Sequence, residues 1–163
     1  MPKVVGENNL NSKYLQDIAQ IAADGAPVSN DKIRQQTEKL QNALVSVKDG
    51  VVVVDRSNSN SYAVIENLAG RFNSDSAAQN LRGKKILKLD LGGIFADSVS
   101  AEQVSARLRE ALAQIEKSRG NAFLYVEDIA VFAKYNPLFG AVVADALRAS
   151  LTTGKVRVIS VSN

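Results

Sequence analysis

The sequence predicts an α/β fold in which about four strands form a parallel, doubly wound sheet with helices on both faces. Apolar runs of strand length alternate with amphipathic helical patterns, which is the order that builds parallel sheets. Residues 122–126 are apolar throughout, as expected for a strand buried on both faces. The chain has 163 residues, of which 45% are hydrophobic and only three are proline, so we expect one packed domain.

The N-terminal part of the chain is predicted to be helical. Residues 1–10 are expected to be a tail or a short edge segment, and residues 11–163 to form a single domain. Two helices should precede the first strand, one ending before Pro27 and the next capped by Asn30 or Asp31. Helical spacing directs the following residues inward: Tyr14, Ile18, Ile21 and Ala22 from the first helix, and Ile33, Thr37, Leu40 and Leu44 from the second.

Four strands and three helices are then predicted in alternation. Gly92 follows the second strand, Gly120 ends a helix over residues 101–117, and Pro137 opens the last helix. Residues 73–80 are polar and are expected to form a loop. The predicted strands are residues 51–54, 85–91, 122–126 and 156–161.

Composition argues against several classes of function. The chain has no histidine, the commonest general base and metal ligand, and no cysteine for disulfide or thiolate chemistry. No metal site and no cofactor are therefore expected. The net charge is +3, aromatic content is 6%, and basic and aromatic residues do not interleave, so we expect no nucleic-acid partner. No apolar run reaches the roughly 18 residues of a membrane span. We expect a cytoplasmic protein with no membrane partner.

The turn after the first predicted strand stands where a phosphate-binding loop would, but without its chemistry. A P-loop reads G-x-x-x-x-G-K-[ST], with glycines that let backbone amides wrap phosphate and a lysine that reaches it. Here Asp55 and Asn60 occupy the two glycine positions. Ser61 replaces the lysine, and Tyr62 replaces the Mg²⁺-binding hydroxyl. We expect a degenerate loop without nucleotide, composed of Asp55, Arg56, Ser57, Asn58, Ser59, Asn60, Ser61 and Tyr62.

An alternative interpretation of this loop is a variant anion site. A helix N-terminus favours anions even without a lysine, because its first backbone N–H groups have no intrahelical partner. The carboxylate of Asp55 disfavours that alternative, since it would repel a phosphate at the mouth of the loop.

Several short segments follow one another at a characteristic spacing. They are A-V-I-E-N-L-A-G-R-F at residues 63–72, L-D-L-G at 89–92, F-L-Y-V-E-D-I at 123–129 and A-S-L-T-T-G-K-V at 149–156. Together they resemble the first ATPase module of the Clp-type AAA+ unfoldases and disaggregases, over roughly residues 14–163. The resemblance implies a P-loop NTPase fold of the AAA+ large-subdomain type. It also implies that the strands lie in the spatial order first, fourth, third, second.

The chain departs from that family where the family's chemistry resides. The family's Walker B strand ends in Asp-Glu, whereas this chain has Glu127 and Asp128, the same charges in reversed order. The exchange would shift each carboxylate by on the order of an ångström, which is costly for positioning. Ser162 or Asn163 fits the polar sensor 1 position. At the family's pore-loop position, residues 99–102 contain no aromatic side chain, so we do not expect them to grip a client polypeptide.

Two other groups are candidates for protein contacts. Lys84, Lys85 and Lys88 form the densest basic set and could meet an acidic partner, although a solvated surface is the ordinary explanation. An unusually apolar stretch lies near the start of the last helix, and it either packs in the core or forms a partner surface. This candidate partner surface consists of Phe132, Tyr135, Leu138 and Phe139.

These observations favour a catalytically inactive, pseudo-ATPase AAA+-like domain that is not an enzyme and acts through protein–protein contacts, in regulation or assembly. Two alternatives stay open. One is an excised fragment of a longer Clp-like ATP-dependent chaperone, and the other is an unrelated binding or enzyme module on a doubly wound sheet.

The family's fifth strand and small helical subdomain would follow Asn163. Without that strand, residues 51–54 are expected at a sheet edge, which invites pairing. We expect residues 2–5 to cover the edge, or a neighbouring copy to do so and make a homo-oligomer.

Overall fold

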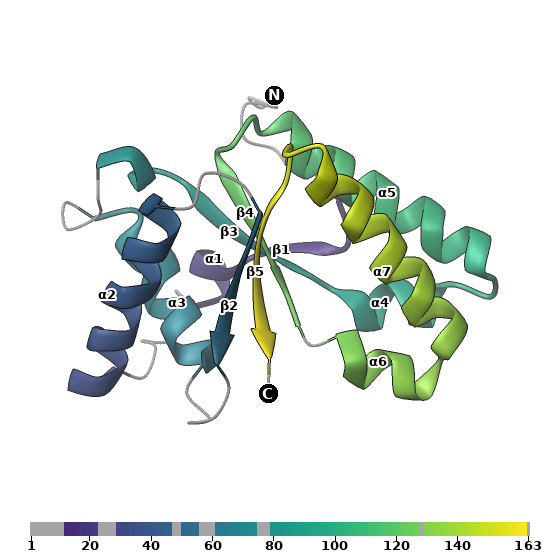
Figure 1. Ribbon diagram of the computed structural model, residues 1–163, viewed down its shortest axis with the longest axis horizontal. Coiled ribbons are helices and arrows are strands. Elements are labelled where there is room, and N and C mark those ends of the chain that lie inside the picture. Colours follow the sequence, from purple (N-terminus) through teal and green to yellow (C-terminus); the bar gives the residue numbers. More distant parts are fainter. Residues whose placement is uncertain are drawn as a thin grey trace, which may run out of the picture.

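The computed structural model describes residues 12–22, 29–46, 50–55, 61–74, 79–127 and 129–162. These residues form one sheet between two layers of helices (Figure 1). The predicted tail, residues 1–10, lies outside the described residues. The elements in chain order are β1 (Leu15–Asp17), α1 (Ile18–Ala22), α2 (Asp31–Ser46), β2 (Gly50–Asp55), α3 (Ser61–Arg71), η1 (Gln79–Leu81), β3 (Lys85–Leu89), α4 (Leu91–Asp97), α5 (Ala101–Lys117), β4 (Ala122–Val126), α6 (Ile129–Tyr135), α7 (Pro137–Thr152) and β5 (Arg157–Ser162).

The sheet has the order β1-β3-β4-β5-β2. Strands β2, β5, β4 and β3 are parallel to one another, and they stand in the order predicted for the first, fourth, third and second strands. The predicted α/β fold class is therefore confirmed. Strand β2 is the last in this order, so β5 is its only neighbour among the described strands.

Strand β1 corrects the interpretation of the N-terminal region. We predicted one helix across residues 14–22, but only α1 is helical there, and β1 pairs antiparallel with β3. The residue pattern explains the strand, because Leu15 is buried and Gln16 is exposed, as in a half-buried edge strand. The backbone N–H of Asp90 continues the contact by donating to the carbonyl oxygen of Tyr14, at 2.8 Å. The sheet is consequently mixed.

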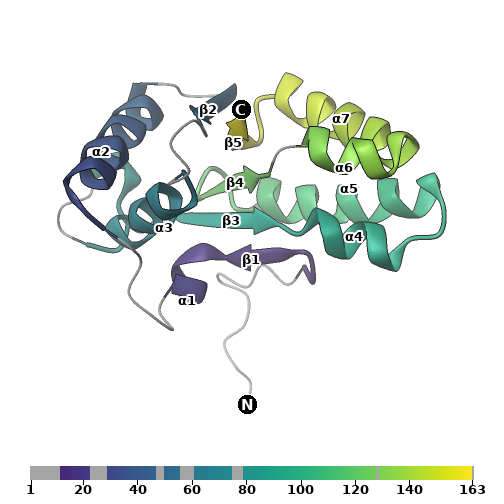
Figure 2. The ribbon, with the colours of Figure 1, turned by 90° about the horizontal axis from the view of Figure 1, so that it is seen from below.

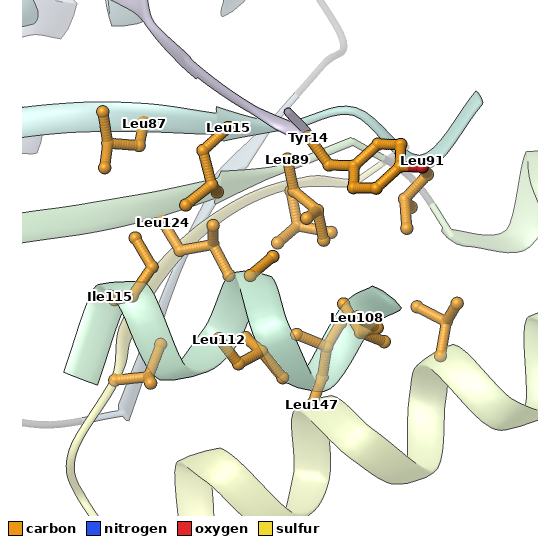
Figure 3. Close-up of a cluster of buried hydrophobic side chains, with 14 of the residues drawn as sticks. Tyr14, Leu15, Leu87, Leu89, Leu91, Leu108, Leu112, Ile115, Leu124 and Leu147 are labelled. Atoms are coloured by element: carbon orange, nitrogen blue, oxygen red, sulfur yellow. The ribbon is translucent and has the colours of Figure 1, made fainter. Parts of the chain in front are cut away.

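Helices cover both faces of the sheet (Figure 2). Helices α1, α2 and α3 pack on one face, and α4, α5, α6 and α7 on the other. Strand β4 contributes side chains to both hydrophobic clusters. Leu124 and Val126 belong to the cluster on the α5 side, while Phe123 and Tyr125 belong to the cluster beneath α3. Figure 3 shows the first cluster, in which leucines of the strands meet those of α5 and α7. None of the described helices is long and apolar enough to cross a membrane.

Two predicted boundaries differ for local reasons. Strand β3 ends at Leu89, not at residue 91, because Asp90 caps α4: its Oδ1 accepts from the N–H of Gly93, at 2.9 Å. A Cβ at position 93 would come within 2.4 Å of Oδ2 of the same carboxylate, so glycine leaves room for the cap. Within the predicted loop 73–80, η1 begins at Gln79, since the buried Leu81 anchors that turn to the core.

The apolar stretch near residue 135 forms a helix–helix corner. Asn136 separates α6 from α7 and caps α7, with its side-chain Oδ1 accepting from the N–H of Phe139 at 3.1 Å. The two helices approach closely at Gly140, where a Cβ would lie 2.7 Å from the Cβ of Ala133. A side chain at position 140 would therefore push α6 and α7 apart.

Candidate functional site

The predicted loop, acidic and sensor positions meet at the carboxyl edge of the sheet. Parallel strands bring their carboxyl ends together, and ligands bind at that edge in open α/β sheets. Strand β2 ends at Asp55, which lies opposite Ser162 of β5 in register, and Glu127 follows β4 directly. Figure 1 shows the arrowheads of β2 and β5 side by side at this edge. The other predicted positions lie outside the described residues: residues 56–60, Asp128 and Asn163.

Helix α3 begins at this edge with Ser61, which is buried, and Tyr62, which is half-buried. The ring of Tyr62 lies 6.1 Å from that of Tyr125, between centroids, at an angle of 49°. Burial raises the pKa of the Tyr62 hydroxyl, and the positive charge of Lys88 opposes part of that rise. The position that the resemblance gives to a small Mg²⁺-binding hydroxyl thus holds an aromatic ring packed on β4.

Lys88 completes a cluster at the same edge. Its Nζ lies 3.3 Å from Oε1 of Glu127 and 5.4 Å from the centroid of the Tyr62 ring. The Lys88 side chain is 25% exposed and that of Glu127 is 40% exposed, so water only partly screens this ion pair. An ammonium group over an aromatic face gains about 0.5–1 kcal/mol at such sites. Residues from β3, the end of β4 and the start of α3 therefore converge on one cation.

The sequence places Lys88 in a group with two neighbouring lysines, and the structure separates the three. Lys84 donates to a backbone carbonyl in the turn before β4, and Lys85 pairs with Asp17 at 3.7 Å. The two-residue period of β3 indicates the direction of the Lys88 side chain. Lys88 lies two residues after the buried Ile86 and therefore faces the α3 layer. A lysine directed toward that layer needs a counter-charge, and Glu127 supplies it.

The candidate partner surface divides into a packed half and an exposed half. Phe132 and Phe139 are partly buried and pack edge-on against Phe95 of α4, with ring centroids 5.6 and 5.4 Å away. Tyr135 is 86% exposed and Leu138 is 62% exposed. We call this exposed pair, Tyr135 and Leu138, the α6–α7 corner. The sequence left core packing and a partner surface as alternatives for the four residues. The structure shows packing for Phe132 and Phe139 and exposure for Tyr135 and Leu138.

A groove of about 790 Å³ runs between α5 and α7. Its walls carry charges of both signs, including Arg109, Asp145 and Lys155. Among the described residues, none of those at the carboxyl edge lines it, so the groove is separate from the cluster around Lys88.

Comparison with known proteins identifies relatives of the chain. No protein-family model matches it. The chaperone protein ClpB of Leptolyngbya boryana is 29% identical over 160 residues, which are 94% of this chain and 18% of that protein. ClpB of Gloeobacter violaceus is 28% identical over 152 residues, 90% of this chain and 17% of that protein. The chain is related to the Clp-type AAA+ chaperones. It spans about a fifth of the length of the curated relatives it matches.

Solved structures agree with the Clp-type relationship. The closed state of Hsp104 with ATPγS and FITC-casein has a TM-score of 0.74 and 22% identity, covering 92% of this chain and 26% of that chain. The Hsp104–ADP complex of S. cerevisiae has a TM-score of 0.68 and 24% identity over the same shares. Identity at this level shows the fold alone, and that fold is the one implied by the resemblance. The predicted resemblance to a Clp-type AAA+ module is confirmed.

The relationship corrects one expectation. We predicted from the altered loop that the chain is not an enzyme, but its relatives are Clp-type chaperones and the matched Hsp104 structures are complexes with ATPγS and ADP. That prediction is wrong. It rested on the identities of the loop residues, and these do not define the backbone that would surround a nucleotide. The relationship also favours the interpretation as a piece of a longer Clp-like chaperone over that of a separate inactive regulator.

Proposed function

We propose that the chain works in the cytoplasm as one AAA+ module of a Clp-type chaperone and contacts client protein through the α6–α7 corner. The observation that carries the first part is the relationship to ClpB, which extends over 94% of the chain. A module that spans about a fifth of its relatives' length contributes one part of a larger assembly. The described residues best support a role as a surface that binds other polypeptides.

The α6–α7 corner has the chemistry for client contact. One of the matched Hsp104 structures is a complex with FITC-casein. Such contacts need exposed apolar and aromatic side chains, and Tyr135 and Leu138 supply both on a surface of this chain. The backbone of the corner is held in place by the Asn136 cap and by the packing of Phe132 and Phe139 on Phe95. A preorganised contact loses less conformational entropy on binding.

The segment at residues 99–102 is the other place where a client could be held. Val99 is 87% exposed, but it offers no aromatic ring to a passing chain. Ser100 caps α5 by accepting from the N–H of Gln103, at 3.2 Å, so its hydroxyl is already used within the fold. We therefore expect this segment to contact clients weakly.

The two segments can be compared by photo-crosslinking to fluorescein-labelled casein. A photoreactive amino acid is placed either at position 135 or at position 99, whose native side chains are equally exposed at 86% and 87%. We expect capture of casein from position 135 and none above background from position 99. Capture from position 99 alone would contradict the proposal.

Binding affinity gives an independent measurement. The double variant Tyr135→Ser/Leu138→Ser should bind labelled casein about tenfold more weakly, which corresponds to about 1.4 kcal/mol for the pair. Val45→Ser, which alters an exposed apolar residue of α2, is the matched control and should bind like the wild type. Fluorescence anisotropy measures both. Equal affinities for the double variant and the wild type, or no casein binding by the wild type, would refute the client role.

A further inference from the structure

Lys88 contacts Glu127 and Tyr62, which occupy two positions that the family resemblance assigns to Mg²⁺ binding. In that resemblance, a loop hydroxyl and the acidic residues at the end of the third predicted strand serve Mg²⁺. Here the hydroxyl position is Tyr62, and the carboxylate of Glu127 faces the ammonium group of Lys88 at 3.3 Å. The positive charge next to this carboxylate is therefore part of the protein.

The described residues do not fit Mg²⁺ at this carboxylate. Mg²⁺ requires near-octahedral oxygen coordination, usually through carboxylates and water. An ion bound to Glu127 would lie close to the fixed charge of Lys88, and two positive charges at such a distance repel each other strongly in a partly shielded site.

The surroundings hold Lys88 in place. The face of the Tyr62 ring attracts its ammonium group, and that ring in turn packs against Tyr125 of β4. The Lys88 side chain is 25% exposed, so its loss would leave Glu127 in a partly shielded position without its described cation. A partly shielded carboxylate without a counter-charge attracts another cation.

We propose that Lys88 is a built-in counter-ion that takes the place of a divalent cation at Glu127. The tethered ammonium group neutralises the carboxylate permanently, and it excludes metal ions from this position by charge repulsion. The consequence is a specific one: Lys88 decides whether this edge of the sheet binds a divalent metal. The inference goes beyond client binding and does not depend on it.

The test uses Mn²⁺ as a paramagnetic substitute for Mg²⁺. Electron paramagnetic resonance measures free Mn²⁺ during titration of the wild type, Lys88→Met and the control Lys85→Met. Methionine keeps an apolar stem that can stay on the Tyr62 ring. Lys85→Met removes the same charge from the same strand, also from an ion pair. We expect Lys88→Met to bind Mn²⁺ at least about tenfold more tightly than the wild type, because the repelling charge is gone. The control should match the wild type.

A second variant assigns the bound ion to Glu127. Adding Glu127→Gln to Lys88→Met should abolish the gain in Mn²⁺ affinity. Circular dichroism melting checks folding and gives another readout: excess Mg²⁺ should raise the melting temperature of Lys88→Met over its value in EDTA and leave that of the wild type unchanged. Lys88→Gln replaces Lys88→Met if the latter does not fold.

Three results would overturn the proposal. These are equal Mn²⁺ affinities for the Lys88 variant and the wild type, an equal gain in the Lys85 control, or a gain that survives Glu127→Gln. Casein binding by Lys88→Met should equal that of the wild type, so a failure of the client role would appear in the casein assays and leave the Mn²⁺ comparison intact.

Discussion

Replacement of Phe95 by alanine should destabilise the domain by about 2–4 kcal/mol. The Phe95 ring meets Phe132 at an interplanar angle of 84° and Phe139 at 73°, both edge-to-face arrangements. Each such pair contributes about 0.5–1.5 kcal/mol beyond area burial. Because the side chain is only partly buried, the loss of apolar contact adds roughly half of the 1.5–3 kcal/mol that full burial of a phenylalanine gives. The sum is about 2–4 kcal/mol, which overlaps the lower part of the 3–5 kcal/mol typical of fully buried positions.

Urea unfolding of Phe95→Ala measures this loss, and Tyr135→Ala is the matched control. Tyr135 belongs to the same apolar stretch but is 86% exposed, so its truncation should cost less than about 0.5 kcal/mol. Comparing the two variants therefore distinguishes the loss of a packed aromatic ring from the loss of an exposed one. A loss below about 1 kcal/mol for Phe95→Ala, or a similar loss for both variants, would refute the division of the stretch into a packed and an exposed half.

Two more predictions concern the N-terminal part of the chain. Hydrogen bonds from Lys13 and Tyr14 hold the pKa of Asp97 below its ordinary value. Their stabilising effect is complete above the unfolded-state pKa of about 3.9 and is lost as pH falls through the lowered pKa, so thermal melting of Asp97→Asn should show a smaller loss of stability on acidification than the wild type. Deletion of residues 1–7 should leave amide exchange of Val52 and Val54 unchanged, because β1 joins the sheet at the edge opposite β2. Light scattering by the deletion variant should equal that of the undeleted chain at each protein concentration.

Each of these two predictions has an outcome that would contradict it. Equal acid sensitivity of Asp97→Asn and the wild type would mean that the two hydrogen bonds do not act on stability. Faster exchange at Val52 after the deletion would show that residues 2–5 cover β2, as expected from the sequence.

The sequence by itself determined the parallel core of the sheet. Residues 122–126 are apolar at every position, and this pattern is stable only where helices cover both faces, as β4 shows. The alternation of strands and helices restricts the topology, because crossovers between parallel strands have a fixed hand. With the family resemblance, this was sufficient to predict the order of four strands and the edge where Asp55, Glu127 and Ser162 lie.

Only the tertiary structure decided which side chains face one another. Leu15 and Gln16 fit a helix as well as a strand, and the free edge of β3 selected the strand. Tyr135 and Phe132 stand three residues apart in one apolar stretch, yet only Phe132 meets Phe95. The pairing of Lys88 with Glu127 depends on two adjacent strands and the first turn of α3, which are distant in sequence. Periodicity reports the face on which a side chain lies, whereas its partner depends on long-range packing, and so the cation at the carboxyl edge became visible only in the folded chain.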